Sequence, residues 1–360
     1  MGAPEVVLAR DLRVDGDRWA KGRRLAGPDL ERLRRTDVAV LPAGPVSLLL
    51  LEPGEVHEDE AARRLARMVA GSGLTERGPT ESRVDLLAGH AGVLHVRSAV
   101  VERLNRLDPL EVFTAWDGQV VDEGTLVASV KVAPHVVEAA VLERAERVAA
   151  RGGPVIHVAP FLARRVAVVV KESLRAPARE RFEASVRAKV EGLGSALASI
   201  EYVADDEVAV EAALGRAAGS ADLVLTAGGG STDPADAFFV ALDRLGGRVV
   251  RHGVPAHPGS MLWLGRLGRT AILGLPTCGA YSRATAADLL LPRLLSGEPA
   301  SAATVAKLGH GGILTRDQRF RFPRYARELD ARGVASSRPA QWQAPRPRGR
   351  CRGLDARPGP

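Results

Sequence analysis

Cysteine, lysine and aromatic residues are all scarce in this chain of 360 residues. With only Cys278 and Cys351, the sequence can build neither a disulfide framework nor a cysteine-based zinc site. Because Phe, Trp and Tyr make up only 4% of the residues, the core must come from Leu, Val and Ala, which favours layered α/β packing. The sequence also lacks a long apolar run and a signal-peptide core near its start, so we expect a soluble cytoplasmic protein.

The positive charge of the chain is concentrated near its C-terminus. The formal net charge is +7, yet the segment 316–360 alone contains 12 Arg, no Lys and four acidic residues. The rest of the chain is therefore nearly neutral and offers no basic surface for nucleic acid. Since the segment 316–360 is rich in Arg and Pro and has no apolar period, we expect it to be a disordered tail.

Strand-like and helical patterns alternate regularly between residues 164 and 297. The β-branched run 165–170 is typical of a strand that is buried on both faces. We predict an α/β domain over 164–297, with a three-layer, mostly parallel sheet and helices on both of its faces. Its predicted strands are 165–170, 200–203, 223–226, 248–252, 261–264 and 271–275, and its predicted helices are 177–193, 206–217, 234–245 and 280–295.

The N-terminal part of the chain, 1–160, has shorter segments and many Gly and Pro residues. We predict an α+β region there, built as one or two small lobes. Residues 298–315 form a short extension that we expect to pack back onto the body. The predicted N-terminal strands are 6–9, 37–41, 113–116 and 127–132, and the predicted helices are 27–33, 58–70, 99–107 and 134–151.

Three turns of small residues follow predicted strands of the α/β domain, and they are the candidate ligand site. They are Gly228-Gly229-Gly230-Ser231-Thr232, His257-Pro258-Gly259-Ser260 and Pro276-Thr277-Cys278. In sheets of this class, ligands bind at the carboxyl ends of the strands, where these turns lie. Glycine lets a phosphate approach the backbone, and the hydroxyls supply further donors. The alternative for the first turn is an ordinary tight turn that binds nothing.

Charged residues near these turns are the candidate catalytic groups. Asp233 and Asp236 lie at the start of the predicted helix 234–245, where they could bind Mg²⁺ or molybdate, or cap the helix. Lys171 directly follows the strand 165–170 and is one of five lysines among 50 basic residues. Its compact ammonium could do point-charge chemistry that arginine does not do, or it could be an ordinary solvated lysine. His257 could donate to a phosphate or stay a solvated loop residue, and Cys278 could contact a ligand or be buried as a small residue.

The three turns, in this order and spacing, resemble the molybdopterin-binding (MoaB/Mog-type) domain of molybdopterin molybdotransferases, gephyrin and related adenylyltransferases. The resemblance covers about 164–297 and rests on residues 226–236, 246–259, 264–265 and 274–276. It implies a site for molybdopterin or adenylyl-molybdopterin, with Mg²⁺ on Asp233 and Asp236 and with molybdate as a further ligand. It also implies molybdoenzymes or pathway proteins as partners, a homodimer, and no contact with membranes or specific nucleic acids.

The sequence departs from this family at positions where its enzymes carry functional side chains. Ser260 stands in place of a lysine, residues 277–279 replace Gly-Asn-Pro, and the upstream Asp-Gly-Tyr-Ala element is absent. Lys171 could supply the cation that is missing at Ser260. Two functions are therefore open. One is a molybdotransferase-like enzyme that releases AMP as molybdate is inserted, and the other is a non-catalytic molybdopterin-binding carrier or partner protein. A generic nucleotide-binding domain is disfavoured because the sequence has no Walker or Gly-x-Gly-x-x-Gly fingerprint.

Overall fold

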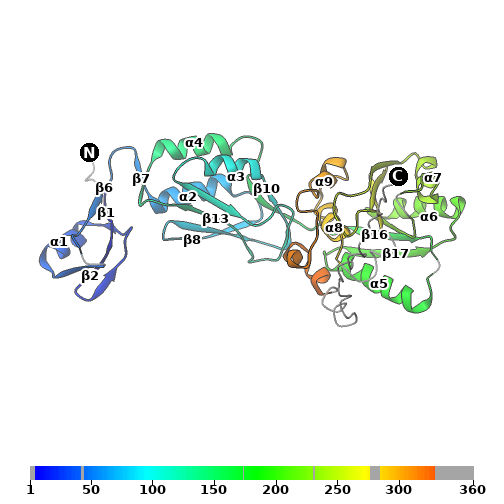
Figure 1. Ribbon diagram of the computed structural model, residues 1–360, viewed down its shortest axis with the longest axis horizontal. Helices are drawn as coiled ribbons and strands as arrows, with labels where there is room; N and C mark the ends of the chain where they lie inside the picture. Colours follow the sequence, from blue (N-terminus) through cyan, green and yellow to red (C-terminus); the bar gives the residue numbers. More distant parts are fainter. Residues whose placement is uncertain (1–4, 42–43, 173, 230–231, 276–283, 329–360) are drawn as a thin grey trace, which may run out of the picture.

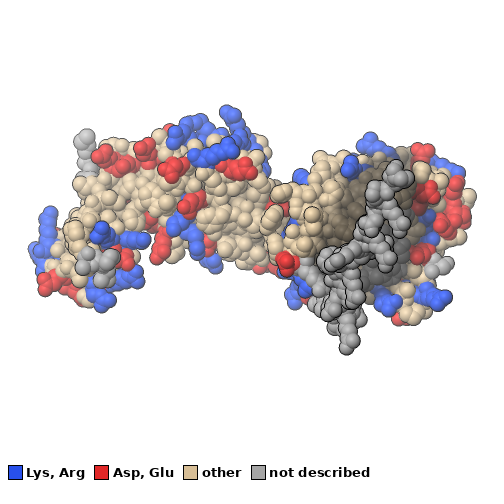
Figure 2. Space-filling view, viewed as in Figure 1, with Lys and Arg blue, Asp and Glu red and all other residues tan. Residues whose placement is uncertain are grey.

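The structure is a computed structural model that describes residues 5–41, 44–172, 174–229, 232–275 and 284–328. Figure 1 shows these residues as an elongated series of packed regions, with the C-terminal α/β sheet at the end opposite the N-terminus. None of the described helices combines the length and the apolarity that a bilayer span requires. Acidic and basic side chains are interspersed on the face shown in Figure 2, as the near-neutral charge of the body leads one to expect.

The α/β region is built on a six-stranded sheet with the strand order β17-β16-β18-β21-β20-β19. The first four strands in this order are parallel neighbours, whereas β20 runs antiparallel to both β21 and β19. This confirms the predicted α/β fold with a mostly parallel sheet. The strands are β16 (Arg165–Val170), β17 (Ala196–Tyr202), β18 (Leu223–Ala227), β19 (Arg248–His252), β20 (Trp263–Leu267) and β21 (Thr270–Leu275).

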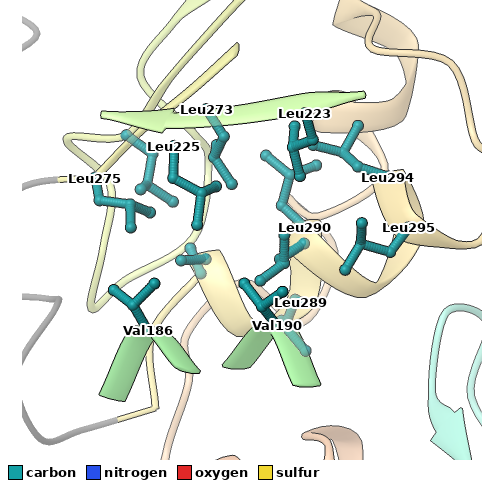
Figure 3. Packing of buried hydrophobic residues seen from close by; sticks show 14 of the residues in the cluster. Val186, Val190, Leu223, Leu225, Leu273, Leu275, Leu289, Leu290, Leu294 and Leu295 are labelled. Carbon is teal, nitrogen blue, oxygen red and sulfur yellow. The ribbon is translucent and has the colours of Figure 1, made fainter. Parts of the chain in front are cut away.

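Helices cover both faces of this sheet. Successive side chains of a buried strand point to opposite faces, so each face has an apolar surface that a helix layer must bury. In β16, Val166 and Val168 belong to one hydrophobic cluster, and Ala167 and Val169 belong to the other. The first cluster is closed by α5 (Ala176–Glu191) and α8 (Ala287–Leu295), whose leucines and valines meet those of the strands in Figure 3. The second is closed by α6 (Glu207–Ser220) and α7 (Ala237–Arg244).

A middle region packs α2 and α3 against a four-stranded antiparallel sheet of order β11-β13-β9-β8, and α4 lies against these two helices. Its hydrophobic cluster extends from Ala61 to Val158 and is separate from the two clusters of the α/β region. The elements are β7 (Glu55–His57), α2 (Glu58–Val69), β8 (Leu74–Thr80), β9 (Arg83–Ala88), β10 (Gly92–Val96), α3 (Ser98–Asn105), β11 (Leu110–Thr114), β12 (Val120–Val121), β13 (Leu126–Val132), β14 (Val136–Glu138), α4 (Ala139–Ala149) and β15 (Ile156–Pro160).

The described residues between 5 and 50 form a small lobe with its own core, which includes Leu8, Leu12 and Trp19. Two three-stranded sheets, of order β4-β1-β6 and β3-β2-β5, make up this lobe together with one helix. The elements are β1 (Val6–Leu8), β2 (Asp11–Val14), β3 (Asp17–Trp19), β4 (Arg24–Leu25), α1 (Gly27–Arg35), β5 (Val38–Leu41) and β6 (Leu48–Leu50). The domain boundaries predicted from the sequence stay predictions.

Several predicted elements are wrong at their ends. The predicted helix 134–151 begins only at Ala139, because Val136 and Val137 form β14 and pair with β7. The predicted helix 234–245 begins at Ala237, since the Asp236 carboxylate accepts a hydrogen bond from the Phe238 backbone N–H at 2.9 Å. Asp236, and not Asp233, is therefore the cap. The predicted strand 261–264 lies at Trp263–Leu267, and the predicted strand 113–116 at Leu110–Thr114. The predicted closing helix 280–295 is described from 284 onward and becomes helical at Ala287.

The C-terminal extension returns to the α/β region as expected, but the predicted disorder from 316 onward is wrong for residues 316–328. The segment contains α9 (Ala302–Ala306) and a 3₁₀ helix, η2 (Arg316–Arg321). Phe322, Tyr325 and Ala326 are buried in the cluster shared with α5 and α8. These apolar residues are too few to give a periodic pattern, and their burial is a tertiary effect. Residues 329–360 lie outside the described part of the chain.

A buried ion pair joins α5 to α8. The Lys189 ammonium contacts the Asp288 carboxylate, and the two side chains are 3% and 0% exposed. The second carboxylate oxygen of Asp288 accepts the Thr285 backbone N–H at 2.9 Å and so orders the start of α8. Tyr325 lies over this pair, with its ring centroid 5.5 Å from the ammonium, and burial raises the pKa of the Tyr325 hydroxyl. The pair thus links two helices and the C-terminal segment.

Replacing Lys189 alone should destabilise the fold, because Asp288 would remain buried without its cation. We expect Lys189→Met to lower the free energy of unfolding by about 3–5 kcal/mol, measured by urea denaturation. The double variant Lys189→Met/Asp288→Asn should recover part of that loss. The control is Lys307→Met, which removes a half-exposed ion pair with Glu298 and should cost no more than about 1 kcal/mol. Equal losses in Lys189→Met and in the control would contradict this prediction.

Candidate functional site

Three neighbouring strands of the α/β sheet bring one lysine and two aspartates together at their carboxyl ends. Lys171 directly follows β16, Asp205 follows β17, and Asp236 lies in the turn after β18. The Lys171 ammonium is 2.8 Å from the Asp205 carboxylate and 3.0 Å from that of Asp236. Lys171 and Asp236 are both candidate catalytic residues predicted from the sequence, and in the structure they contact each other directly.

The two aspartates differ in their exposure. The side chain of Lys171 is 5% exposed and that of Asp236 is 8% exposed, whereas that of Asp205 is 62% exposed. Burial by itself lowers the pKa of the Lys171 ammonium, but the hydrogen bonds to Asp205 and Asp236 outweigh it, so the pKa is raised above its usual value. Lys171 is therefore charged at neutral pH, and its outer partner, Asp205, lies at the surface.

The first glycine-rich turn passes directly over this cluster. Gly228 has φ +93°, and a Cβ atom there would lie 2.9 Å from the Cβ of Glu172. A Cβ atom on Gly229 would lie 2.9 Å from the Asp236 carboxylate. Both positions therefore require glycine, for the backbone conformation at 228 and for close approach at 229. Thr232 is exposed next to the turn, while the predicted ligand residues Gly230 and Ser231 lie outside the described part of the chain.

Both predicted metal ligands already have hydrogen-bond or ion-pair partners in the protein. One oxygen of Asp236 caps α7 and the other pairs with Lys171. Asp233 is exposed, and one of its oxygens accepts the Ala235 backbone N–H at 2.9 Å. Among the described residues, no group of three His, Cys, Asp or Glu side chains is arranged to hold a metal ion. A Mg²⁺ ion on Asp236 would have to take the place of the Lys171 ammonium, so this arrangement does not fit a magnesium site.

The second predicted turn lies at the same edge of the sheet, between β19 and β20, but its described contacts are with other segments. Gly259 has φ +106°, and a Cβ atom there would lie 2.8 Å from the backbone nitrogen of Ala286, next to the start of α8. The backbone of His257 pairs with the C-terminal extension: its N–H donates to Gly312 at 2.7 Å, and its carbonyl accepts from Leu314 at 2.8 Å. The imidazole of His257 is exposed, and Pro258 and Ser260 are half-buried beside it.

Comparison with known proteins identifies part of this region. Residues 166–296 match the sequence model of a protein family described as a probable molybdopterin binding domain. The chain contains a MoaB/Mog-type domain. The match covers the sheet, the helices on its faces, and the Lys171 cluster. A comparison with curated proteins gave no match.

Solved structures similar to this chain include two proteins of molybdopterin biosynthesis. MoaB from Thermus thermophilus is 22% identical with a TM-score of 0.28, and the match covers 38% of this chain and 99% of MoaB. The MoeA protein from Pyrococcus horikoshii is 15% identical with a TM-score of 0.27, and the match covers 71% of this chain and 81% of MoeA. The strand order and the helix packing given above, and not these low scores, define the fold.

The third predicted turn of the MoaB/Mog-type domain, with Pro276, Thr277 and Cys278, lies outside the described residues. The strand before it is fixed by close packing, since a Cβ atom on Gly274 would lie 1.8 Å from the indole nitrogen of Trp263.

Asp205 is a site residue that was not predicted from the sequence. The sequence feature that could have identified it is its place just after the predicted strand 200–203. Its contact with Lys171 becomes evident only from the strand order, in which β17 lies next to β16.

The raised pKa of Lys171 gives a pH dependence of stability. Because the folded-state value lies above the ordinary value of 10.5, the ion pairs stabilise the fold fully below about pH 10.5 and lose this effect as the pH rises through the raised pKa. The Lys171→Met variant lacks this titration. We therefore expect the difference in unfolding free energy between wild type and variant to be constant from pH 7 to 9 and to shrink above pH 10.5. A difference that stays constant up to pH 12 would count against the pairing.

Proposed function

We propose that this protein acts in molybdenum cofactor biosynthesis, where it binds molybdopterin or adenylyl-molybdopterin at the carboxyl edge of its six-stranded sheet and assists the insertion of molybdate. The observation that supports this most directly is the Lys171 ammonium, held beside the Gly228–Gly229 turn within a domain of the molybdopterin-binding family. A fixed cation and a glycine turn are the two components that a bound phosphate or oxyanion needs.

The unequal exposure of the two aspartates suggests how an anionic ligand would enter. Asp236 is buried and is fixed as the cap of α7, so it holds Lys171 from the protein side. Asp205 is largely exposed and has only Lys171 as a described ion-pair partner. A phosphate or molybdate oxygen would replace Asp205 at the ammonium, and Asp205 would turn into solvent. Lys171 would then stabilise negative charge on the ligand without forming a covalent bond.

The backbone of the first turn would supply the remaining contacts. The turn follows β18 at the sheet edge where Lys171 lies, and N–H groups in such a turn donate to phosphate oxygens. His257 and Ser260 lie at the same edge and would bind another part of the pterin ligand. No step in this scheme depends on Mg²⁺, because both oxygens of Asp236 are already engaged.

A second candidate function is a carrier or partner protein that binds molybdopterin without turnover. The specific observation in its favour is the replacement of the family lysine by Ser260, which leaves Lys171 as the cation of the described site. The absence of the Asp-Gly-Tyr-Ala element favours the same function. The predicted cytoplasmic location, homodimer and partner enzymes stay predictions under both functions.

One assay separates the two functions. Purified protein is mixed with adenylyl-molybdopterin and molybdate, with and without Mg²⁺, and both ligand binding and AMP release are followed. We expect the wild type to release AMP, and Lys171→Gln to lower the rate by about 100-fold, the usual effect of removing one electrostatic stabiliser. Lys307→Gln, a lysine outside the site, is the control and should keep the wild-type rate.

The remaining outcomes each decide between the proposals. Tight binding of adenylyl-molybdopterin without AMP release would exclude the enzyme and support the carrier. If neither molybdopterin nor its adenylylated form binds to the folded protein, both proposals fail. The unfolding midpoint of Lys171→Gln shows whether a lower rate comes from the site or from a loss of folded protein.

A further inference from the structure

A polar pocket of about 110 Å³ lies where the N-terminal lobe meets the middle region, far along the chain from the MoaB/Mog-type domain. The N-terminal lobe contributes Arg18 and Lys21, and the middle region contributes Glu58, Lys131 and His135. The pocket is smaller than the roughly 300–1,000 Å³ of pockets that enclose drug-sized ligands. It can therefore take a small ion, or the charged end of a longer ligand.

The junction is closely fitted around one buried carboxylate. Glu58 has a side chain that is only 8% exposed, and its oxygen lies 3.0 Å from a ring nitrogen of His135. Gly22, with φ +78°, brings its backbone so close that a Cβ atom would lie 2.0 Å from the same oxygen. The carbonyl of Gly22 also contacts the ring of the buried His57 at 2.8 Å. These contacts fix the turn that carries Lys21 against the start of α2.

A hairpin tip closes another side of the pocket. Glu81 and Ser82, which join β8 to β9, have φ values of +49° and +61°. Because Thr80 pairs with Arg83, the loop has only two residues, and positive φ at both is the geometry that such a tight hairpin turn requires. Ser82 is 2% exposed although it lies at the tip of the hairpin, whereas Glu81 is exposed. Both residues line the pocket.

Two of the three carboxylates in this pocket already have partners. Asp11 lies 2.6 Å from the Arg18 guanidinium and accepts the Lys21 backbone N–H at 2.8 Å. Glu58 has His135. Glu81, the third, also acts on Arg18, since its negative charge adds to that of Asp11 in raising the pKa of the guanidinium.

Two further charged groups of the pocket are the ammonium groups of Lys21 and Lys131. Neither forms an ion pair with a described residue. Lys131 lies on β13 between Glu111 and Arg83 of the adjacent strands, whose opposite charges offset one another. The other three lysines of the chain, Lys171, Lys189 and Lys307, are each paired with a carboxylate. Among the described residues, the two lysines without an ion pair thus line one pocket, where the backbone N–H of Lys21 and, to a smaller extent, its ammonium lower the pKa of Asp11.

We propose that this pocket binds a dianionic tetrahedral oxyanion of the phosphate type, held between Lys21 and Lys131. Two compact ammonium groups match two negative charges, and each has three N–H donors for the oxygens. The ligand would be inorganic phosphate or the terminal phosphate of a phosphomonoester. It would connect the N-terminal lobe to the middle region, because each lysine comes from a different one. This inference does not rest on the proposed function in cofactor biosynthesis.

The test is calorimetric titration of the full chain at low ionic strength, with inorganic phosphate in one arm and AMP in the other. We expect saturable binding of one phosphate per chain. Lys21→Gln and Lys131→Gln should each weaken it by about tenfold or more, the usual value of a charge-assisted hydrogen bond. Arg144→Gln, which removes an exposed cation of the same region on α4, should change the dissociation constant by less than about twofold. Binding of phosphate but not AMP identifies a site for the free ion, and tighter binding of AMP identifies a site for a phosphate end.

The unfolding midpoints of the three variants are measured to show that each is folded. If Lys131→Gln fails to fold, Lys21→Gln still tests the site, because Lys21 is exposed and its replacement should leave the fold intact. The proposal is overturned if neither anion binds, or if the two lysine variants bind as tightly as Arg144→Gln. AMP is also a product of the proposed reaction, so AMP binding that depends on Lys171 and not on Lys21 or Lys131 is assigned to the other site. If the binding of phosphate also depends on Lys171 and not on Lys21 or Lys131, the proposal is overturned.

Discussion

The buried ammonium of Lys171 is the interaction on which the carboxyl edge of the α/β sheet depends. It joins the ends of three strands that are neighbours in space but separated in sequence, through Asp205 on one side and Asp236 on the other. Because an ionised group is costly to bury without a partner, the buried Lys171 depends most on the buried Asp236, whereas Asp205 is largely exposed. The same carboxylate that holds the lysine also starts α7, so the charge of the site and the local helix geometry are fixed by one side chain.

The sequence was most informative where one segment determines its own structure. The strands 165–170 and 248–252 were predicted to the residue. The first is a buried, β-branched run with few other conformations, and the second is a more exposed edge strand with a pair of valines at 249 and 250. Element ends were predicted less well. Val136 and Val137 form a strand only because β7 is available to pair with them, and Asp236 replaces Asp233 as the cap because the turn takes three more residues. The first effect depends on a strand that is distant in sequence, whereas the second depends on the local path of the turn before α7.

The residues of the candidate site likewise include some that local sequence patterns predict and some that they do not. Lys171 and the Gly228–Gly229 turn were predicted because each follows a recognisable strand, and the structure places them together. Asp205 could not be assigned without the strand order. Likewise, nothing in the sequence relates Lys21 to Lys131, which are brought to one pocket by the junction of two separately formed cores. Local patterns thus identify single groups, and the pairing of groups requires the tertiary fold.

The backbone pairing between His257 and residues 312–314 has a consequence for the order in which the protein matures on the ribosome. The strands of the six-stranded sheet are complete once residue 275 has emerged, and the sheet can form from that point on. The loop that carries His257 must wait for a segment made more than 50 residues later, because its backbone N–H and carbonyl find their described partners only there. During translation, this edge of the domain is therefore among the last parts to reach its final form, together with the core on the α5–α8 face, which also includes Phe322 and Tyr325.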